Sequence, residues 1–544
     1  MRAPFEPFPH VVSKHARDRA THDAIIFLER GEAETERLSY GALETVAASR
    51  AAGLAARGLG GRPVAIAMRP GAAFVGVFLG CLKAGAIAVP VPLADSVRGA
   101  ERLRAILADA RPDAIVADHA ARLEAIAGGA ALVAAGELEG ACTEFQAPDA
   151  DDPALIQYTS GSTSAPKGIV ITHGNLAANQ EMIRSAFAMD EHCIGVNWLP
   201  HFHDMGLMGA ILQPLFVGGT AVLMPPRAFV QKPLRWLRAI EKYAATCAGG
   251  PCFGYDLCVR TIAPEQAAAL DLSSWKTAFC GAEPIRAPVL AAFAQRFAAA
   301  RFRREAFLPC YGLAEATLIA SCTKRGQGVR EKTPQGAARA FVSCGTAVED
   351  SAIMLREETH EICVAGPHVS PGIWDGARRA VTPFPGLFAE DGKTWLATGD
   401  IGAFADGELL VVDRLGDFMI LYGAKVHAAD IEATVLDDPD LRAAAAFAAD
   451  DGTRERLVVL CETDRRTLAA LDRSAAGERL SRRVAEAHGV VPTIGFVAYG
   501  ELPRTSSGKI QRFASRTKFL SGELGVPKVA APMQNTDPHA DRST

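Results

Sequence analysis

The 544-residue sequence has no strong excess of charge of either sign. It contains 57 lysines and arginines against 62 aspartates and glutamates, which gives a formal net charge of -5 at pH 7. A chain with so small a net charge has no overall electrostatic attraction to nucleic acid or to an acidic membrane surface. We therefore expect no nucleic-acid partner.

Long uninterrupted hydrophobic runs are also missing. The most apolar stretch, Ala72 to Ala94, contains Lys83, Pro90 and Pro92, whereas a membrane-spanning helix needs about 20 consecutive apolar residues. The first twenty residues lack the apolar segment of a signal peptide. These two features predict a cytoplasmic protein without stable membrane insertion.

Cysteines are present, but not in the spacings that bind metals. The twelve cysteines form no CxxC pair, and the tightest group is Cys247, Cys252 and Cys258, without a paired set of histidines. We expect reduced, mostly buried thiols. The sequence also lacks a GxSxG nucleophile elbow, which argues against a hydrolase.

The first half of the chain alternates helical and strand-like stretches. We predict a helix over Tyr40 to Leu59 with Ser39 as its N-cap, a strand over Pro63 to Met68, a helix over Ala73 to Lys83 and a strand over Ile87 to Val91. Short buried strands separated by helices are typical of a parallel sheet with helices on its faces.

The pattern changes twice along the second half. From Gly345 to Gly402 the strands become shorter and look antiparallel, and Asp406-Gly407 is typical of a hairpin turn. After Arg414 to Asp417 we predict a smaller α+β segment with one helix over Thr467 to His488. The Ala-rich runs resemble helix-forming composition.

These changes suggest domain boundaries. We predict an N-terminal domain over residues 1–416, a C-terminal domain over 417–525 and a tail over 526–544. The tail is polar, aperiodic and contains prolines, which is typical of disordered segments.

The strongest local signal is Tyr158 to Gly168, with the sequence YTSGSTSAPKG. A glycine- and hydroxyl-rich turn can surround phosphate oxygens with backbone N–H groups and hydroxyls, and Lys167 adds positive charge. It is not a Walker A loop, because Lys167 precedes Gly168 and not Ser or Thr. A flexible surface loop is the alternative.

Six further segments follow in a fixed order. They are Trp198 to Gly206, Gly281 to Pro284, Tyr311 to Thr317, Thr398 to Asp400, Arg414 to Asp417 and Pro503 to Lys509. Together with the glycine-rich run they resemble the motifs of the adenylate-forming superfamily, which comprises acyl-CoA synthetases, peptide-synthetase adenylation domains and luciferases. The resemblance spans about Leu38 to Lys518.

The resemblance implies an α/β fold. It consists of a large N-terminal domain of mixed, largely parallel sheets flanked by helices, with a small β subdomain, and of a hinged C-terminal α+β lid domain. The large domain is expected to bind ATP and the acyl substrate, and the lid to carry a catalytic lysine.

The resemblance also assigns roles to individual residues. Nucleotide binding is assigned to Thr159, Ser160, Gly161, Ser162, Thr163, Lys167, Gly281, Ala282, Glu283, Tyr311, Gly312, Thr317, Asp400 and Arg414. Acyl binding is assigned to His203, Asp204, Met205, Gly206, Phe253 and Cys280. Asp417 is the expected hinge, and the catalytic set is Lys509, His203 and Glu315, with Glu315 holding Mg²⁺.

Each assignment has a chemical reason and a structural alternative. A carboxylate such as Asp400 can accept both ribose hydroxyl protons, but it could also cap a turn. Glu315 offers the hard oxygen that Mg²⁺ prefers, or it could begin a helix. Lys509 can stabilise charge on phosphoryl oxygens, although most lysines are only solvated. His203 gates the acyl pocket or is structural; a zinc site lacks a third nearby ligand.

Within the superfamily, the segments Leu199 to Leu207, Cys280 to Ile285 and Val342 to Gly345 are most similar to fatty acyl-AMP ligases. This implies ATP-dependent activation of a fatty or other apolar carboxylic acid to acyl-AMP, and transfer to the phosphopantetheine thiol of an acyl carrier protein. Two alternatives stay open. One is an acyl-CoA ligase using free coenzyme A, favoured by the short stretch Ser321 to Ala340 and by Gly423 to His427. The other is a catalytically silent protein that binds nucleotide or acyl-adenylate.

Overall fold

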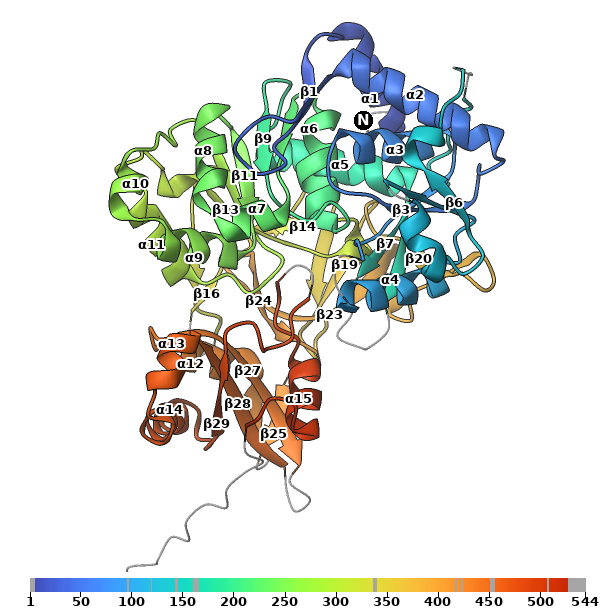
Figure 1. Ribbon diagram of the computed structural model, residues 1–544. Coiled ribbons are helices and arrows are strands. Elements are labelled where there is room, and N and C mark those ends of the chain that lie inside the picture. Colours follow the sequence, from blue (N-terminus) through green and yellow to red (C-terminus); the bar gives the residue numbers. More distant parts are fainter. Residues whose placement is uncertain are drawn as a thin grey trace, which may run out of the picture. The chain divides into compact units, whose positions relative to one another are not determined.

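The computed structural model describes residues 5–94, 97–118, 120–141, 145–159, 166–335, 340–415, 418–421, 424–450, 455–505 and 508–526 (Figure 1). The chain divides into two compact units, unit 1 (Met1–Val412) and unit 2 (Asp413–Thr544). Most of the predicted disordered tail, from residue 527 onward, lies outside the described residues.

The first sheet of unit 1 has nine strands. In spatial order they are β17 (Thr346–Ala347), β14 (Ile319–Cys322), β13 (Phe307–Gly312), β12 (Thr277–Cys280), β11 (Cys247–Gly250), β9 (Ile194–Asn197), β10 (Thr220–Leu223), β1 (Asp23–Phe27) and β2 (Glu36–Ser39). The strands from β13 to β1 run parallel, and the pairs at both edges are antiparallel.

The second sheet has eight strands. In spatial order they are β21 (Ala380–Thr382), β20 (Gly372–Asp375), β8 (Lys167–Thr172), β7 (Pro153–Thr159), β4 (Ile87–Pro90), β3 (Pro63–Ala67), β5 (Ala114–Ala117) and β6 (Ala131–Ala134). The strands from β7 to β6 are parallel, while β8, β20 and β21 extend the sheet with antiparallel pairs.

A third, smaller sheet contains β18 (Ala352–Leu355), β19 (Glu361–Ala365), β23 (Lys393–Ala405), β22 (Leu387–Glu390) and β24 (Glu408–Arg414). A two-stranded ribbon consists of β15 (Glu331–Lys332) and β16 (Phe341–Val342). Between β23 and β24, Asp406 and Gly407 have φ values of 50° and 75°, as the two-residue hairpin turn that we predicted requires.

Helices cover both large sheets. They are α1 (Phe8–Asp18), α2 (Tyr40–Ala56), α3 (Ala72–Lys83), α4 (Val97–Ala110), α5 (His173–Phe187), α6 (Gln213–Phe216), α7 (Pro226–Gln231), α8 (Leu234–Lys242), α9 (Cys252–Thr261), α10 (Pro264–Ala268) and α11 (Ala287–Arg296). Shorter 3₁₀ segments are η1 (Ala120–Ile126), η2 (Ala135–Glu137), η4 (Arg304–Ala306) and η5 (Ala314–Ala316), and η3 (Met205–Leu212) is a π-helix. In Figure 1, α8 to α11 surround β11 and β13, and α3 and α4 flank β3.

Alternate residues of the central strands face different helical layers. In β3, Val64 and Ile66 pack in one cluster with residues of α1, α2 and α3, whereas Ala65 and Ala67 pack in another with α4. Successive side chains of a strand point to opposite faces. The sheet is therefore buried on both sides, which explains its almost continuous apolar sequence.

Unit 2 is the predicted α+β segment. Its strands are β25 (Phe418–Leu421) with β26 (Ala424–His427), and a three-stranded sheet of β27 (Leu441–Asp450), β28 (Glu455–Thr463) and β29 (Thr493–Ala498). Its helices are α12 (Ala428–Leu436), α13 (Arg465–Ala470), α14 (Arg473–His488) and α15 (Arg512–Ser521).

Two expectations for unit 2 were wrong in detail. The single helix predicted over Thr467 to His488 is interrupted, because Asp472 accepts hydrogen bonds from the backbone N–H groups of Ser474 and Ala475 and starts a new helix there. One Ala-rich run forms strand β27 and not a helix. The architecture as a whole confirms the predicted fold class.

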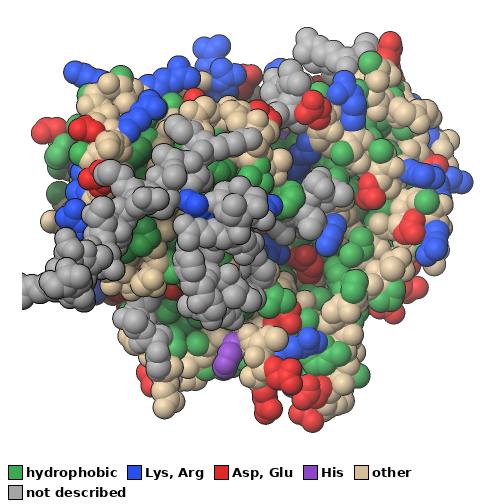
Figure 2. Space-filling model, turned by 90° about the horizontal axis from the view of Figure 1, so that it is seen from below, with side chains coloured by type: hydrophobic (Ala, Val, Ile, Leu, Met, Phe, Trp, Pro, Cys, Tyr) green, Lys and Arg blue, Asp and Glu red, His purple; other side chains and the backbone are tan. Residues whose placement is uncertain are grey.

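The surface shows no dominant charge. On the face seen in Figure 2, basic and acidic side chains are interspersed with apolar ones, in keeping with the small net charge. No helix in the described part of the chain is long and apolar enough to cross a membrane. Eleven cysteines are described; all are free thiols, and all but Cys310 are buried.

Candidate active site

Asp400 lies in a bulge of strand β23 and not at a hairpin turn. The register of β19 against β23 shifts here, so that Glu361 pairs with Ile401 but Cys363 pairs with Ala397. The backbone N–H of Asp400 donates to Thr398 Oγ1 at 3.1 Å. A bulge re-aims a side chain out of the ladder, and it leaves the Asp400 carboxylate partly exposed.

Two neighbours hold this bulge in place. The Tyr311 hydroxyl donates to Asp400 Oδ2 at 2.7 Å, and the buried Glu361 accepts at Oε1 from the Gly399 N–H at 2.9 Å. Burial, and next the charge of Asp400, raise the pKa of Tyr311 well above its usual value. The phenol therefore stays protonated and acts as a donor to the carboxylate.

Glu315 lies in the tight loop that follows Tyr311, as predicted. The loop consists of the 3₁₀ turn η5 and of Thr317, which has a φ of 63° and donates from Oγ1 to His368 O at 2.7 Å. Gly312 has no room for a side chain, because an added Cβ would lie 1.8 Å from Leu318 O. The glycine is what allows the chain to double back so closely here.

Ser370 connects this loop to the second sheet. Its N–H donates to Glu315 O at 2.9 Å, and its hydroxyl donates to Val170 O in β8 at 2.6 Å. The side chain is 1% exposed. One buried serine thus fixes the Glu315 loop against the strand that follows the glycine-rich run.

The glycine-rich run joins β7 to β8. Thr159 and Lys167 are paired across this hairpin, and the Lys167 side chain is exposed. The predicted phosphate-binding residues Ser160, Gly161, Ser162 and Thr163 lie outside the described residues. Their role stays a prediction, as does that of the two flanking residues.

The segment Trp198 to Gly206 is anchored at several points. His201 is buried and its Nε2 lies 2.9 Å from Met68 O, so this histidine is structural. The Gln157 side chain donates to Phe202 O at 2.6 Å. The next residue, His203, is partly buried, and its ring centroid lies 5.1 Å from that of Phe202.

The segment ends where η3 begins. Asp204 caps this π-helix by accepting at Oδ1 from the Met205 N–H at 2.6 Å. Gly206 is buried, and an added Cβ would lie 2.0 Å from Pro200 O. The absence of a side chain at Gly206 therefore allows two backbone segments to approach each other closely. Such π-helical turns are frequent at functional sites.

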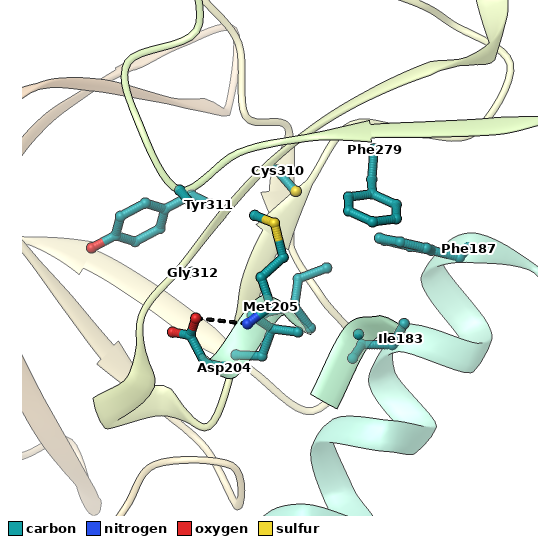
Figure 3. A pocket seen from close by; sticks show the side chains of 12 residues that line it. Ile183, Phe187, Asp204, Met205, Phe279, Cys310, Tyr311 and Gly312 are labelled. Carbon is teal, nitrogen blue, oxygen red and sulfur yellow. Dashed lines mark hydrogen bonds between the residues drawn. The ribbon is translucent and has the colours of Figure 1, made fainter. Parts of the chain in front are cut away.

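A pocket with about 530 Å³ of empty space, part of it open to solvent, lies beside this segment (Figure 3). Its lining residues are Ile183, Phe187, Asp204, Met205, Gly209, Phe279, Ala282, Cys310, Tyr311, Gly312, Leu318 and Ile319. Most are apolar, and Asp204 is the charged one. Asp204 and Met205, two of the residues predicted to bind the acyl group, thus line this pocket.

Strand geometry decides which residues of β12 reach this pocket. Phe279 lines it, whereas its neighbour Cys280 packs on the opposite face of the sheet with residues of α9 and α11. Phe253 packs against Trp198, with ring centroids 5.5 Å apart. Four residues that were expected to bind the acyl group are not part of the pocket lining: His203, Gly206, Phe253 and Cys280.

The Gly281 to Glu283 loop follows β12. An added Cβ at Gly281 would lie 2.7 Å from Cys310 O, and Ala282 has a φ of 67°. Glu283 accepts from the Phe253 N–H at 2.7 Å. The loop is therefore packed tightly on β13, one residue from Tyr311, where an adenine-side loop was expected.

Unit 2 carries Lys509 on a hairpin. Lys509 is exposed, its N–H donates to Thr505 Oγ1 at 3.0 Å, and its carbonyl accepts from the Thr505 N–H at 2.7 Å. The base of the hairpin is held by an ion pair between Arg504 and the buried Glu462. Lys509 thus projects from an anchored loop.

The predicted hinge lies close to the division between the units. Arg414 is exposed and directly follows the buried Asp413, whose Oδ2 lies 2.6 Å from His427 Nδ1. Asp417 lies outside the described residues. The ribose role of Arg414 and the hinge role of Asp417 stay predictions.

Metal binding needs a separate test. No cluster of three or more His, Cys, Asp or Glu side chains that could hold a metal ion occurs among the described residues. Mg²⁺ commonly binds one or two carboxylates plus substrate phosphates. The partly buried Glu315 carboxylate fits that mode.

Sequence reasoning missed two residues that organise the site, Glu361 and Ser370. Glu361 had a usable signal, because it is a charged residue beginning an otherwise apolar strand, EICVA. Ser370 had none, since the two distant groups that it binds, the backbone carbonyls of Glu315 and Val170, are more than 50 residues away in the sequence.

The chain is similar to known proteins over most of its length. The family model described as AMP-binding enzyme matches residues 12–374. The medium-chain-fatty-acid–[acyl-carrier-protein] ligase JamA of Moorena producens is 34% identical, over 93% of this chain and 94% of its own. The 4-hydroxyphenylalkanoate adenylyltransferase of Mycobacterium tuberculosis is 33% identical, over 85% of this chain and 83% of its own.

Solved structures are similar over nearly the whole chain. A structure from a study of fatty acyl-adenylate ligases of E. coli and L. pneumophila has a TM-score of 0.84 at 28% identity and covers 96% of this chain and 99% of its own. A fatty acyl-adenylate ligase of L. pneumophila in complex with acyl adenylate and pyrophosphate has a TM-score of 0.71 at 33% identity, over 94% and 96% of the two chains.

Proposed function

The chain belongs to the AMP-binding enzyme family, and we propose that it activates an apolar carboxylic acid with ATP and passes the acyl group to the phosphopantetheine thiol of an acyl carrier protein. One observation carries the proposal. Tyr311 both holds the Asp400 carboxylate and lines the apolar pocket, so a nucleotide and an acyl tail would meet at one residue.

In the first step, a carboxylate oxygen of the acid attacks the α-phosphorus of ATP, and the bond to pyrophosphate breaks. No general base is needed, because a carboxylate is already ionised at neutral pH. Asp400 accepts the ribose hydroxyl protons, and Tyr311 holds it in the orientation to do so. These contacts position the α-phosphate relative to the pocket.

Positive charge must offset the charge that develops on the phosphoryl oxygens. We assign Lys509 and Lys167 to this task. Mg²⁺, held by Glu315, would supply further charge neutralisation between the phosphates. In the second step, a thiol sulfur attacks the acyl carbon, the bond to AMP breaks, and the thiol proton passes to solvent.

The identity of the acceptor thiol is part of the proposal. The acyl-carrier-protein ligase named above supports a carrier protein, whereas a 33% identical relative from Caulobacter vibrioides named putative acyl-CoA synthetase favours free coenzyme A as the second candidate. We also propose a cytoplasmic location, since free thiols persist in a reducing compartment.

The test measures pyrophosphate release from ATP with a panel of unbranched apolar acids, followed by acyl transfer to holo acyl carrier protein or to free coenzyme A. We expect acid-dependent release and transfer to the carrier protein. Transfer to coenzyme A alone would reassign the acceptor. Absence of acid-dependent release across the panel would instead support a catalytically silent binding protein.

A further inference from the structure

Two phenylalanine rings close one end of the apolar pocket. Phe187 is the last residue of α5, and Phe279 lies in β12. Their ring centroids are 6.0 Å apart, the rings are tilted by 32°, and the residues are 8% and 5% exposed. Figure 3 shows the two rings side by side, at the end of the pocket away from the Tyr311 hydroxyl.

The position of Tyr311 gives the pocket a direction. Its hydroxyl bonds to Asp400 at 2.7 Å, so this end faces the candidate ribose site. Met205 and Cys310 lie between Tyr311 and the two phenylalanines in Figure 3. An acid whose carboxylate reacts at the nucleotide would therefore extend its tail toward Phe187 and Phe279.

The end of the pocket that contains Phe187 and Phe279 is tightly packed. An added Cβ at Gly249 of β11 would lie 2.6 Å from Phe279 Cγ, so the ring rests directly on the neighbouring strand and cannot retreat. Met189, Cys193 and Val217 pack in the same apolar cluster as the rings, but they are not among the residues that line the pocket. We infer from this packing that an acyl tail ends at the two phenylalanines.

The side walls suit a flexible apolar tail. Ile183, Leu318 and Ile319 are aliphatic, and Met205 is a side chain that adapts to its neighbours. Gly209 adds no side chain, although a Cβ there would lie 3.3 Å from Leu318 Cδ2, a contact that a small shift of the leucine relieves. A polar tail would lose hydration here without gaining hydrogen bonds.

We propose that Phe187 and Phe279 set the maximum length of the acid, and that the substrate is an unbranched aliphatic acid whose terminal methyl group rests on these rings. The inference rests on the proposed function and adds to it the residues that limit the length of the acyl chain. A longer acid fits only by displacing one of these packed rings. A shorter acid leaves part of the pocket unfilled.

The test compares kcat/KM for a series of unbranched saturated acids of increasing length, with pyrophosphate release as the readout. Phe187→Ala should move the preferred length upward and raise kcat/KM for an acid just above the wild-type limit by about tenfold or more. Gly209→Val, which adds a side chain to the lining of the pocket, should move the preferred length downward. The two variants are thus predicted to shift selectivity in opposite directions.

Phe216→Ala is the matched control. Phe216 is the last residue of α6 and packs against the same apolar cluster, but it does not line the pocket. This variant should keep the wild-type length preference. Thermal unfolding shows whether each variant is folded, and if Phe187→Ala is not, the smaller change Phe187→Leu takes its place.

Different results would contradict the proposed function and the role of the two phenylalanines. A wild-type enzyme that releases no pyrophosphate with any acid contradicts the proposed function. A wild-type enzyme with a defined length limit that the Phe187 variant does not shift contradicts only the role of the phenylalanine pair.

Discussion

Replacing Tyr311 with phenylalanine removes a single oxygen from the candidate ribose site. The lost contact is the 2.7 Å bond from the hydroxyl to Asp400 Oδ2, and the residue is 7% exposed. A hydrogen bond to a charged group contributes roughly 1.5 to 3 kcal/mol. Since about 1.4 kcal/mol corresponds to a factor of ten, Tyr311→Phe should lower kcat/KM for ATP by about 10- to 150-fold.

Initial rates of pyrophosphate release, measured at varied ATP and saturating acid, give this ratio. Tyr255→Phe is the control, because this tyrosine is fully buried and donates to Phe279 O at 2.8 Å, away from Asp400. It should lower the unfolding temperature without raising KM for ATP. If Tyr311→Phe changes stability alone and leaves kcat/KM for ATP unaltered, the assignment of Asp400 to the ribose is wrong.

Three further predictions test other parts of the structure. Glu361→Ala removes the acceptor of the Gly399 N–H and should raise KM for ATP severalfold while leaving KM for the acid unchanged. Glu361→Gln keeps an acceptor oxygen and should have the wild-type KM for ATP. Lys509→Ala should slow acyl-AMP formation by roughly a hundredfold or more but spare transfer from supplied acyl-AMP, so equal losses in both steps would refute its role. Burial lowers the pKa of His201 from 6.5 to about 4, so the unfolded chain binds its proton first as the pH falls. As the pH falls from 6.5 to about 4, this residue should therefore lower the free energy of unfolding by about 1.4 kcal/mol per pH unit. His201→Gln should make the melting temperature depend less on pH.

Much of the fold follows from local sequence. The helix predicted from Tyr40 is capped by Ser39, whose hydroxyl accepts from the Ala42 N–H. The strand predicted over Pro63 to Met68 is β3 (Pro63–Ala67). A capping residue marks the start of the helix, and a short, continuously apolar run marks the buried strand.

The Ala-rich strand β27 shows where local reasoning fails. Alanine favours helices, but here tertiary packing overrides that preference. Ala444 and Ala446 pack in a cluster with residues of α12 and α14, while Ala443 and Ala445 pack with Phe519 of α15. Small side chains allow helices to approach both faces of this strand, which no local pattern reveals.

The candidate site was predictable in its motifs but not in its geometry. The order of the segments identified Tyr311 and Asp400, yet the bond between them joins residues 89 positions apart. Strand alternation places Phe279 in the pocket and Cys280 outside it, and this depends on the register of a parallel sheet. A sequence motif predicts which segment lies near the site, whereas the pairing of strands decides which of its side chains face the pocket.

The Ser370 bridge has a consequence for how the site is assembled. Because its N–H binds the Glu315 loop and its hydroxyl binds β8, the relative placement of these two segments is settled when the domain folds. In the proposed reaction, a nucleotide that binds there would not have to order these segments, so the entropy cost of ordering them would not weaken its affinity. Under this proposal, the preformed nucleotide site and the walls of the apolar pocket have separate tasks, so a change in the walls would alter the choice of acid without disturbing the reaction with ATP.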